Sequence, residues 1–271
     1  MPELPEVETT MSALQPFVEK KIVSVDINNR NLRWKIKKDF EKNISNKKIT
    51  SITRRAKYII FNLSDGFIIL HLGMSGNIRI QDYKSNTYKK HDHIIFYLKD
   101  EKIIYNDIRR FGSIHFTNNV KDHFLIKNLG PEPLSKDFNK KYLFNISRKS
   151  KTNIKNFIMN QKVVVGVGNI YASEALFKAK INPNTITSSI NEEDCKRLVK
   201  SIKNILNIAI KMGGTTLKDF YSADGSEGYF KIKLKVYGRE NKKCKSCKGV
   251  IQKIVLNQRS TFYCEDCQKQ L

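Results

Sequence analysis

The chain has 271 residues and a large excess of basic side chains, 50 Lys and Arg against 26 Asp and Glu. The formal charge of +24 is far more than solubility requires, so a polyanion is the expected partner. No stretch approaches the roughly 20 apolar residues of a membrane span, and the acidic N-terminus is unlike a secretory signal, which favours a cytoplasmic protein.

The N-terminal segment, residues 1–6, places a proline directly after the initiator methionine. Removal of that methionine would leave the secondary amine of Pro2 as the N-terminus. An α-amino group titrates near ~8, so a useful fraction is an unprotonated nucleophile at neutral pH. Attack on a masked aldehyde carbon would give an iminium, with Glu3 beside it to move protons. On these residues alone, a frayed terminus ahead of a helix is the commoner explanation.

The next hundred residues change from helical to β periodicity. Apolar residues at intervals of three and four predict a helix from Pro5 to about Val18. Short β-rich runs separated by turn residues follow to about Phe116, and their spacing favours a sandwich or barrel. The clearest runs are 22–27, 58–61, 67–72, 93–98 and 102–105.

Beyond Asn118 the periodicity is helical to about Met212. The clearest helix follows Ser189, which has the spacing of a capping box with Glu192, and Gly213 and Gly214 end it. The segment 129–133 suits neither helix nor strand and predicts a domain boundary. The small, polar residues 221–228 predict a loop, either a binding lid or an unremarkable surface loop.

Four of the five cysteines form two C-x-x-C pairs near the C-terminus. The pairs Cys244/Cys247 and Cys264/Cys267 are separated by sixteen residues, the spacing of a four-cysteine zinc ribbon. Four thiolates leave no open position for water, so one structural Zn²⁺ is expected. The residues between the pairs, 250–256 and 259–263, predict a hairpin. The fifth, Cys195, is expected to be an unpaired thiol.

Other segments combine glycine, basic and aromatic residues. The turn 166–168 before a helix starting near Asn169 suits a close approach of backbone to phosphate, as in a helix-two-turn-helix. Arg54-Arg55 and Arg109-Arg110-Phe111 fit either insertion into a base stack or a solvated edge strand. His91 and His93 could share a strand face, but with no third ligand nearby a metal is not expected there.

Together these segments resemble the bacterial formamidopyrimidine-DNA glycosylases. The matching motifs are 2–9, 54–58, 71–76, 162–174, 213–220 and the cysteine pairs, in the family's order and over nearly the whole chain. The resemblance implies a monomeric base excision repair enzyme without a small-molecule cofactor. Such an enzyme flips and excises oxidised purines (8-oxoguanine, formamidopyrimidines) from duplex DNA through an N-terminal proline Schiff base and cleaves the strand by β,δ-elimination.

The expected fold is α+β in three parts. An N-terminal helix and β-sandwich form a catalytic domain over 1–130. A helix-two-turn-helix DNA-binding domain spans 131–235, and a zinc-ribbon β-hairpin spans 236–271.

The resemblance also implies catalytic roles. Pro2 would attack C1′ of the damaged nucleotide, and Glu3 would be the acid that assists sugar-ring opening. Lys57 would contact the lesion and its phosphate and help proton transfer. Arg259, at the tip of the zinc hairpin, would clamp the phosphates that flank the flipped nucleotide.

Further residues are implied as DNA contacts. Met74, Arg109 and Phe111 would fill the space vacated by the flipped base, with Arg109 reading the opposite cytosine. Asn169 would hold phosphate from the helix-two-turn-helix. His91 and Lys155 would be additional contacts, and the loop 221–228 would close over the extruded base.

Two departures from the family pattern concern DNA contacts. Ile108 stands where the family usually has proline, so the loop that presents Arg109 is expected to be less rigid. Ser150 interrupts a run that is often continuously basic. Two alternatives stay open: an endonuclease VIII-like glycosylase for oxidised pyrimidines, and a non-enzymatic zinc-ribbon protein that binds DNA.

Overall fold

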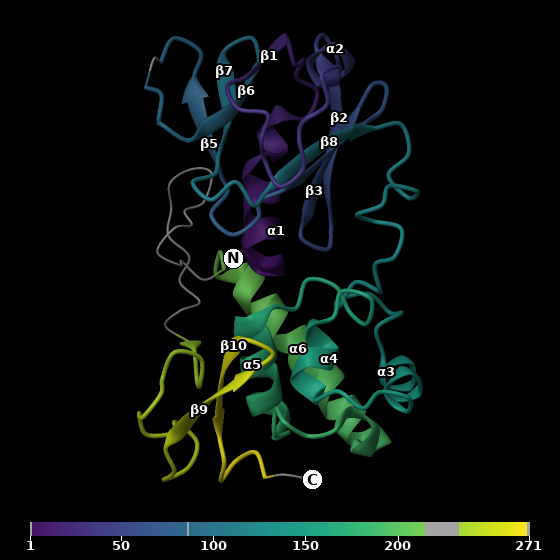
Figure 1. Ribbon diagram of the computed structural model, residues 1–271, viewed down its shortest axis with the longest axis vertical. Helices are drawn as coiled ribbons and strands as arrows, with labels where there is room; N and C mark the ends of the chain where they lie inside the picture. The colour runs from purple at the N-terminus through teal and green to yellow at the C-terminus, as the bar shows by residue number, and fades with distance from the viewer. Residues whose placement is uncertain (1, 86, 215–232, 270–271) are drawn as a thin grey trace. The chain divides into compact units, whose positions relative to one another are not determined.

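The computed structural model describes residues 2–85, 87–214 and 233–269, which fall into two compact units (Figure 1). The first unit comprises the chain to residue 127 with residues 212–214, and the second comprises 128–211 and 233–269. The finer three-part division at 130 and 235 stays a prediction. Within the described ranges, no helix has both the length and the apolar character needed to span a membrane.

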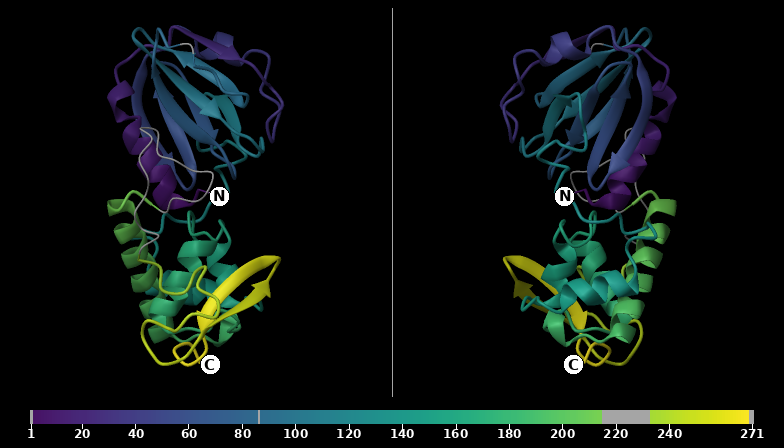
Figure 2. Two further views of the ribbon diagram at one scale, coloured as in Figure 1. Left: turned by 90° about the vertical axis from the view of Figure 1, so that its left-hand side faces the viewer. Right: turned by 90° about the vertical axis from the view of Figure 1, so that its right-hand side faces the viewer.

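The first unit is a β-sandwich with helices at its margin. One antiparallel sheet has the order β1-β6-β7-β5 and the other β2-β3-β4-β8. Figure 2 shows the two sheets face to face with helix α1 (Leu4–Ala13) beside them. The strands are β1 (Ser24–Ile27), β2 (Ile49–Arg55), β3 (Tyr58–Leu63), β4 (Phe67–His71), β5 (Asn77–Asp82), β6 (Asp92–Tyr97), β7 (Glu101–Asn106) and β8 (Ser113–Thr117), with α2 at Phe40–Ile44.

The apolar side chains of both sheets and of α1 form one core. Phe61 of β3 and Phe96 of β6 stack across the sandwich with ring centroids 6.4 Å apart. Val7 and Leu14 add the buried face of the N-terminal helix to the same cluster. Each fully buried side chain of this size contributes about 1.5–3 kcal/mol. The predicted sandwich is therefore confirmed, with the five predicted runs lying on β1, β3, β4, β6 and β7.

The N-terminal helix is shorter than predicted. It ends at Ala13 and is followed by a separate 3-10 turn, η1 (Gln15–Phe17), so the prediction that it continues to Val18 was wrong. Pro16 explains the difference, because proline lacks the N–H that an α-helix would use there and its ring clashes with the preceding turn.

The second unit is helical and ends in a two-stranded hairpin. Its elements are α3 (Lys140–Ser147), α4 (Ile154–Met159), α5 (Asn169–Ala179), η2 (Thr187–Ser189), α6 (Glu192–Lys211), β9 (Ile251–Leu256) and β10 (Arg259–Cys264). The hairpin lies against α5 (Figure 1), and the predicted helix at Asn169 and the predicted hairpin are confirmed.

Helix α6 begins with a different capping box from the predicted one. The N–H of Asn191 donates to the carboxylate of Asp194 (3.1 Å), and the N–H of Asp194 donates to Oδ1 of Asn191 (2.9 Å). The hydroxyl of Ser189 donates instead to the carbonyl of Ile186 (2.8 Å). The box predicted for Ser189 and Glu192 was wrong by two residues. The predicted end is confirmed, since α6 stops at Lys211 before Gly213, whose φ is +70°.

His115 of β8 makes the stability of the first unit dependent on pH. Its ring lies among those of Trp34, His123 and Phe124, and burial, followed by the nearby charges of His123 and Lys37, lowers its pKa from 6.5 to about 4. Between these values the unfolded chain binds a proton that the folded chain does not. The contribution is therefore fully present above pH 6.5 and is lost as the pH falls toward 4.

We expect His115→Phe to flatten the pH dependence of unfolding. The melting temperature of the parent, followed by circular dichroism, should fall between pH 6.5 and about 4 more steeply than that of the variant. Equal slopes for the two proteins would show that His115 does not titrate in this way.

Candidate functional site

The N-terminal residues Pro2 and Glu3 are packed within the first unit. Pro2 is buried, and the Glu3 side chain is only 3 % exposed. Glu3 is the N-cap of α1 and forms a reciprocal capping box with Glu6, in which the Glu3 N–H donates to Glu6 Oε2 at 2.8 Å. This arrangement is incompatible with a frayed terminus. It fixes a carboxylate at the helix N-terminus one residue after the candidate nucleophile.

Lys57 lies in the two-residue turn between β2 and β3. Ala56, the other turn residue, has φ +55°, and Lys57 itself is 7 % exposed. The hairpin is tied to α1 because the Arg54 guanidinium forms an ion pair with Glu8 and also donates to the Ala56 carbonyl at 2.8 Å. Glu3 is the N-cap of the same helix. The basic segment 54–58 therefore fixes the position of Lys57 relative to α1 and to the N-terminal residues that precede it.

Three residues predicted to fill the duplex line one cleft of the first unit. The cleft measures about 640 Å³. Met74 and Phe111 are 38 % and 45 % exposed there, and the Arg109 guanidinium lies 4.8 Å from the centre of the Phe111 ring. The full lining is Asn31, Leu32, Arg33, His71, Gly73, Met74, Arg109, Arg110 and Phe111. The structure therefore brings together two motifs that lie more than thirty residues apart in the sequence.

The loop that presents Arg109 is held by the buried carboxylate of Asp107, which is 0 % exposed. It accepts hydrogen bonds from the hydroxyl of Ser75 (2.6 Å), the phenol of Tyr105 (3.0 Å) and the N–H of Gly112 (2.8 Å). The Ser75 hydroxyl in turn accepts the N–H of Arg109 at 3.0 Å. Asp107 and Ser75 were missed as site residues, although Asp107 lies two residues before the predicted basic pair Arg109-Arg110 and Ser75 lies within the motif 71–76.

The Asp107 network bears on the departure at residue 108. Ile108 is 56 % exposed, so its side chain does not brace the loop from inside. The loop also abuts the 71–76 turn, where a Cβ on Gly73 would lie 2.3 Å from the Gly112 nitrogen. The loop is thus held by hydrogen bonds and by close backbone packing, and the lower rigidity expected from Ile108 stays a prediction.

Histidines near this cleft have different surroundings. Burial, then the charges of Lys57 and Arg33, lower the pKa of His71 to about 4, although Asp107 opposes the shift. His71 is therefore neutral at neutral pH, and its Nδ1 accepts the Gly73 N–H at 3.2 Å. His93 is buried, with Nε2 2.8 Å from the Asp107 carbonyl, whereas His91 is half-buried.

In the second unit, Lys155 and Asn169 join the helices to the zinc hairpin. Lys155 is 1 % exposed, and its ammonium donates to Asn169 Oδ1 (2.6 Å), Thr261 Oγ1 (2.6 Å) and the Ser260 carbonyl (3.2 Å). Asn169 also donates to the Ser260 carbonyl at 3.0 Å. Arg259, the residue before these contacts, is exposed at the start of β10. A DNA contact by Lys155 itself stays a prediction.

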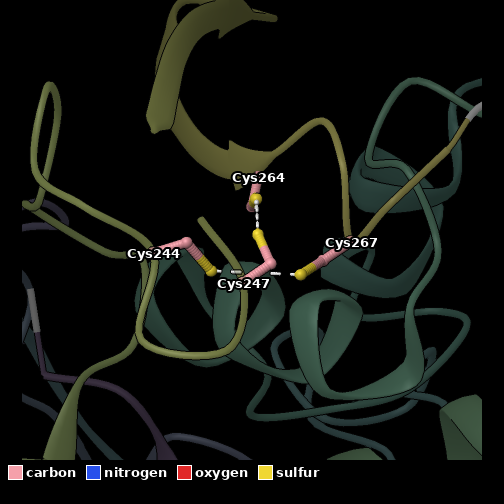
Figure 3. A group of neighbouring side chains, drawn as sticks. All are labelled: Cys244, Cys247, Cys264 and Cys267. Carbon is pink, nitrogen blue, oxygen red and sulfur yellow. Dashed lines mark hydrogen bonds between the residues drawn. The ribbon is translucent and has the colours of Figure 1, made fainter. Parts of the chain in front are cut away.

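The four predicted ligand cysteines converge at the base of the hairpin (Figure 3). The Sγ atoms of Cys244 and Cys267 are 3.9 Å apart, those of Cys247 and Cys264 are 3.4 Å apart, and all four lie within 4.8 Å of one another. A tetrahedral Zn²⁺ with Zn–S bonds of about 2.3 Å requires sulfur separations near ~3.8 Å. The donor set therefore fits one closed, structural zinc site.

Loss of one cysteine ligand should unfold the zinc ribbon. Its apolar core is small, so metal binding supplies much of the free energy that stabilises its fold. We expect Cys247→Ala to lose zinc and DNA affinity together, measured by metal analysis and by duplex titration. Cys195→Ala, at a buried cysteine outside the cluster, should keep its zinc. Unchanged DNA affinity in a zinc-free variant would refute a role for the ribbon in supporting Arg259.

Three family models match successive parts of the chain. They are the formamidopyrimidine-DNA glycosylase N-terminal domain over residues 1–114, the H2TH domain of the same enzymes over 129–221, and a zinc finger found in FPG and IleRS over 241–270. The formamidopyrimidine-DNA glycosylase of Histophilus somni (strain 129Pt) is 46 % identical over 99 % of this chain and 100 % of its own. The chain belongs to the formamidopyrimidine-DNA glycosylase family.

Other members of this family agree along their whole length. The enzyme of Hydrogenovibrio crunogenus is 47 % identical over 100 % of this chain and 98 % of its own. A point mutant of the Lactococcus lactis FPG, solved with DNA containing Fapy-dG, superposes with a TM-score of 0.92 at 38 % identity. That match covers 99 % of this chain and 100 % of the other. The predicted α+β fold, structural zinc and enzymatic character are confirmed, which decides against a non-enzymatic DNA-binding protein.

Proposed function

We propose that this DNA repair glycosylase excises oxidised purines from duplex DNA and cleaves the strand with the amine of Pro2 as nucleophile. The observation that carries the proposal is the buried, capped N-terminus, in which Pro2 directly precedes the fixed carboxylate of Glu3. Relatives from Lactococcus lactis were solved in complex with DNA containing Fapy-dG or an abasic site, the substrate and the intermediate that such a reaction requires.

The first chemical step forms one bond and breaks one. The lone pair of the Pro2 nitrogen attacks C1′, and the bond from C1′ to the damaged base breaks with its electrons leaving on the base. In the next step the Pro2 nitrogen loses its proton, Glu3 donates a proton to the sugar-ring oxygen, and the C1′–O bond of the ring breaks as the nitrogen lone pair forms the C=N bond of an iminium. Lys57, on the hairpin tied to the same helix, assists proton transfer. General acid–base help of this kind contributes about 10²–10⁴-fold.

Strand cleavage follows from the electron demand of the iminium. The positive charge on nitrogen acidifies the proton at C2′, and its removal expels the 3′ phosphate by β-elimination. A second elimination removes the C4′ proton and expels the 5′ phosphate, and hydrolysis of the iminium returns the free amine. At both the 3′ and the 5′ side of the sugar, the phosphate leaves with its bonding electrons, so the reaction needs no oxidant or reductant.

Base flipping is supported by the cleft in the first unit. Extruding a base costs a few kcal/mol, and exposed apolar side chains can replace the lost stacking. Met74 and Phe111 are exposed at this cleft, and Arg109 adds donors for the opposite cytosine. The contact of Arg109 with the Phe111 ring holds the guanidinium in a defined place. The loop 221–228, proposed to close over the extruded base, lies outside the described residues.

Phosphate binding is assigned to the second unit and to the overall charge. Arg259 is exposed at the hairpin tip, and Asn169 lies at the N-terminus of α5, where backbone N–H groups favour an anion. His91 is proposed as a further contact from the first unit. With a formal charge of +24, affinity for DNA should fall steeply as salt rises. A DNA repair enzyme must reach chromosomal DNA. We therefore propose that the protein is located in the bacterial cytoplasm.

Oxidised pyrimidines form a second candidate substrate class. The wild-type Lactococcus lactis FPG, which superposes on this chain with a TM-score of 0.91 at 37 % identity, was solved with DNA containing an oxidised pyrimidine. Competition between duplexes with 8-oxoguanine and with thymine glycol measures the preference directly. Faster excision of 8-oxoguanine supports the purine assignment, and faster excision of thymine glycol overturns it.

Borohydride trapping tests the proposed nucleophile. Untagged protein that has lost Met1 is mixed with a duplex carrying one 8-oxoguanine opposite cytosine and, separately, with an undamaged duplex. Reduction of the iminium should leave a stable adduct on the damaged strand alone, and peptide mapping should place it at Pro2. An adduct at a lysine side chain, or none from zinc-loaded protein, would reject the proposal.

A further inference from the structure

A cavity of about 420 Å³ lies in the second unit, between α5, α6 and the polypeptide near the zinc site. Its lining residues are Glu174, Phe177, Lys178, Lys180, Asn204, Ile205, Ile208, Lys233, Lys235, Ser246 and Cys267. None of them belongs to the catalytic or DNA-binding residues assigned above, although Cys267 is a zinc ligand. The cavity is therefore a separate feature of this unit.

The cavity has an apolar floor and a cationic rim. Phe177 of α5 and Ile205 of α6 are almost fully buried, and Ile208, one turn further along α6, is 38 % exposed. Four of the lining residues are exposed lysines: Lys178, Lys180, Lys233 and Lys235. A ligand for this site must combine apolar groups with more than one negative charge.

The one carboxylate among the described lining residues is already engaged. Glu174 is 3 % exposed and accepts the backbone N–H groups of Lys235, Val236 and Tyr237, each at 2.9 Å. These bonds hold the wall that carries Lys235. The buried Glu174 carboxylate is hydrogen-bonded to these backbone N–H groups. Among the described residues it therefore forms no ion pair that would neutralise the exposed lysines at the rim.

We propose that this cavity is a docking site for an acidic peptide segment with apolar side chains, supplied by a partner protein. The apolar floor would take one or two aliphatic or aromatic side chains, and the lysines would pair with flanking carboxylates. A second copy of this chain is a poor occupant, because it also carries a formal charge of +24.

Duplex DNA fits the cavity less well than such a peptide. A phosphate backbone has no apolar groups to cover Phe177 and Ile208. The cavity also lies at the C-terminal end of α5, whereas the proposed phosphate ligand Asn169 is its first residue. Eight residues of helix separate Asn169 from Phe177, or about 12 Å. DNA held at the N-terminus of α5 would therefore leave the cavity accessible for a partner.

The test uses the full-length, zinc-loaded protein and a dye-labelled peptide of sequence Glu-Asp-Leu-Phe-Glu-Asp, followed by fluorescence anisotropy. A matched peptide with Gln and Asn in place of the acids reports the charge requirement. Lys235→Glu reverses one positive charge at the rim of the cavity, and Ile208→Asp places a carboxylate among its apolar lining residues. Lys141→Glu, at an exposed lysine of α3 outside the lining, is the matched control. Zinc content and melting temperature verify the fold of every variant.

We expect the acidic peptide to bind the parent and the Lys141→Glu protein equally, and to bind each cavity variant on the order of tenfold more weakly. Binding should weaken as salt rises, and the uncharged peptide should bind poorly. No binding by the parent, equal binding of both peptides, or binding unaffected by both cavity variants would each overturn the proposal. So would a finding that Lys235→Glu lowers affinity for undamaged duplex more than Lys141→Glu does, with no effect on the peptide.

Discussion

A protein with one extra serine before Pro2 is expected to bind damaged duplex with unchanged affinity and to cleave it at no detectable rate. The extension converts the Pro2 nitrogen to a tertiary amide, which has no lone pair available for attack on C1′. It also displaces the free amine by one residue. Loss of a covalent nucleophile typically reduces turnover by about 10³–10⁶-fold.

Pro2→Gly tests the same step with a smaller change. A terminal glycine keeps an amine but loses the ring that restricts its orientation, so we expect slow cleavage and little borohydride-trapped adduct. Single-turnover cleavage and equilibrium binding should be measured on one 8-oxoguanine duplex. Intact-mass spectrometry must first show which N-terminus each protein carries. Cleavage at the parental rate by the serine-extended protein would eliminate Pro2 as the nucleophile.

The sequence was most informative where function depends on local spacing. The two C-x-x-C pairs predicted the zinc site because a tetrahedral metal accepts few ligand spacings. The β-rich runs predicted the sandwich because alternation and turn residues act over a few positions. Even the wrong C-terminal end of α1 has a local cause, Pro16, which was present in the sequence and interrupts the helical pattern.

What the sequence did not show depends on contacts between distant residues. Asp107 meets Ser75 across 32 positions, and Lys155 meets Thr261 across 106. No periodicity relates such pairs, so their pairing is decided only by the assembled fold. The same limit applies to the lysine-rimmed cavity, whose lining comes from helices and zinc-binding loops far apart in the chain. The family resemblance predicted roles for individual catalytic and DNA-binding residues. It did not predict which other residues hold those side chains in position.

Lys155→Met is expected to lower kcat/KM on an 8-oxoguanine duplex by about 10²-fold while zinc stays bound. The buried ammonium donates to Asn169, Thr261 and the Ser260 carbonyl, directly beside Arg259. Methionine has a similar length but no donors, so Asn169 Oδ1 and Thr261 Oγ1 each lose a donor at a cost of about 1–3 kcal/mol, while the Ser260 carbonyl keeps its bond from Asn169. A displacement of Arg259 and Asn169 by about 1 Å would be enough for a loss of this size.

The salt dependence of binding separates positioning from direct contact. If Lys155 only positions its neighbours, Lys155→Met keeps the same number of phosphate contacts, and the slope of log affinity against log salt stays that of the parent. If its ammonium neutralises a phosphate, the slope becomes less negative by about 0.9. Arg259→Met, on the exposed tip of the same hairpin, is the matched comparison and should show that change. Because Lys155 is 1 % exposed, we expect its variant to lose turnover with the parental slope, whereas Arg259→Met should lose turnover with a less negative slope.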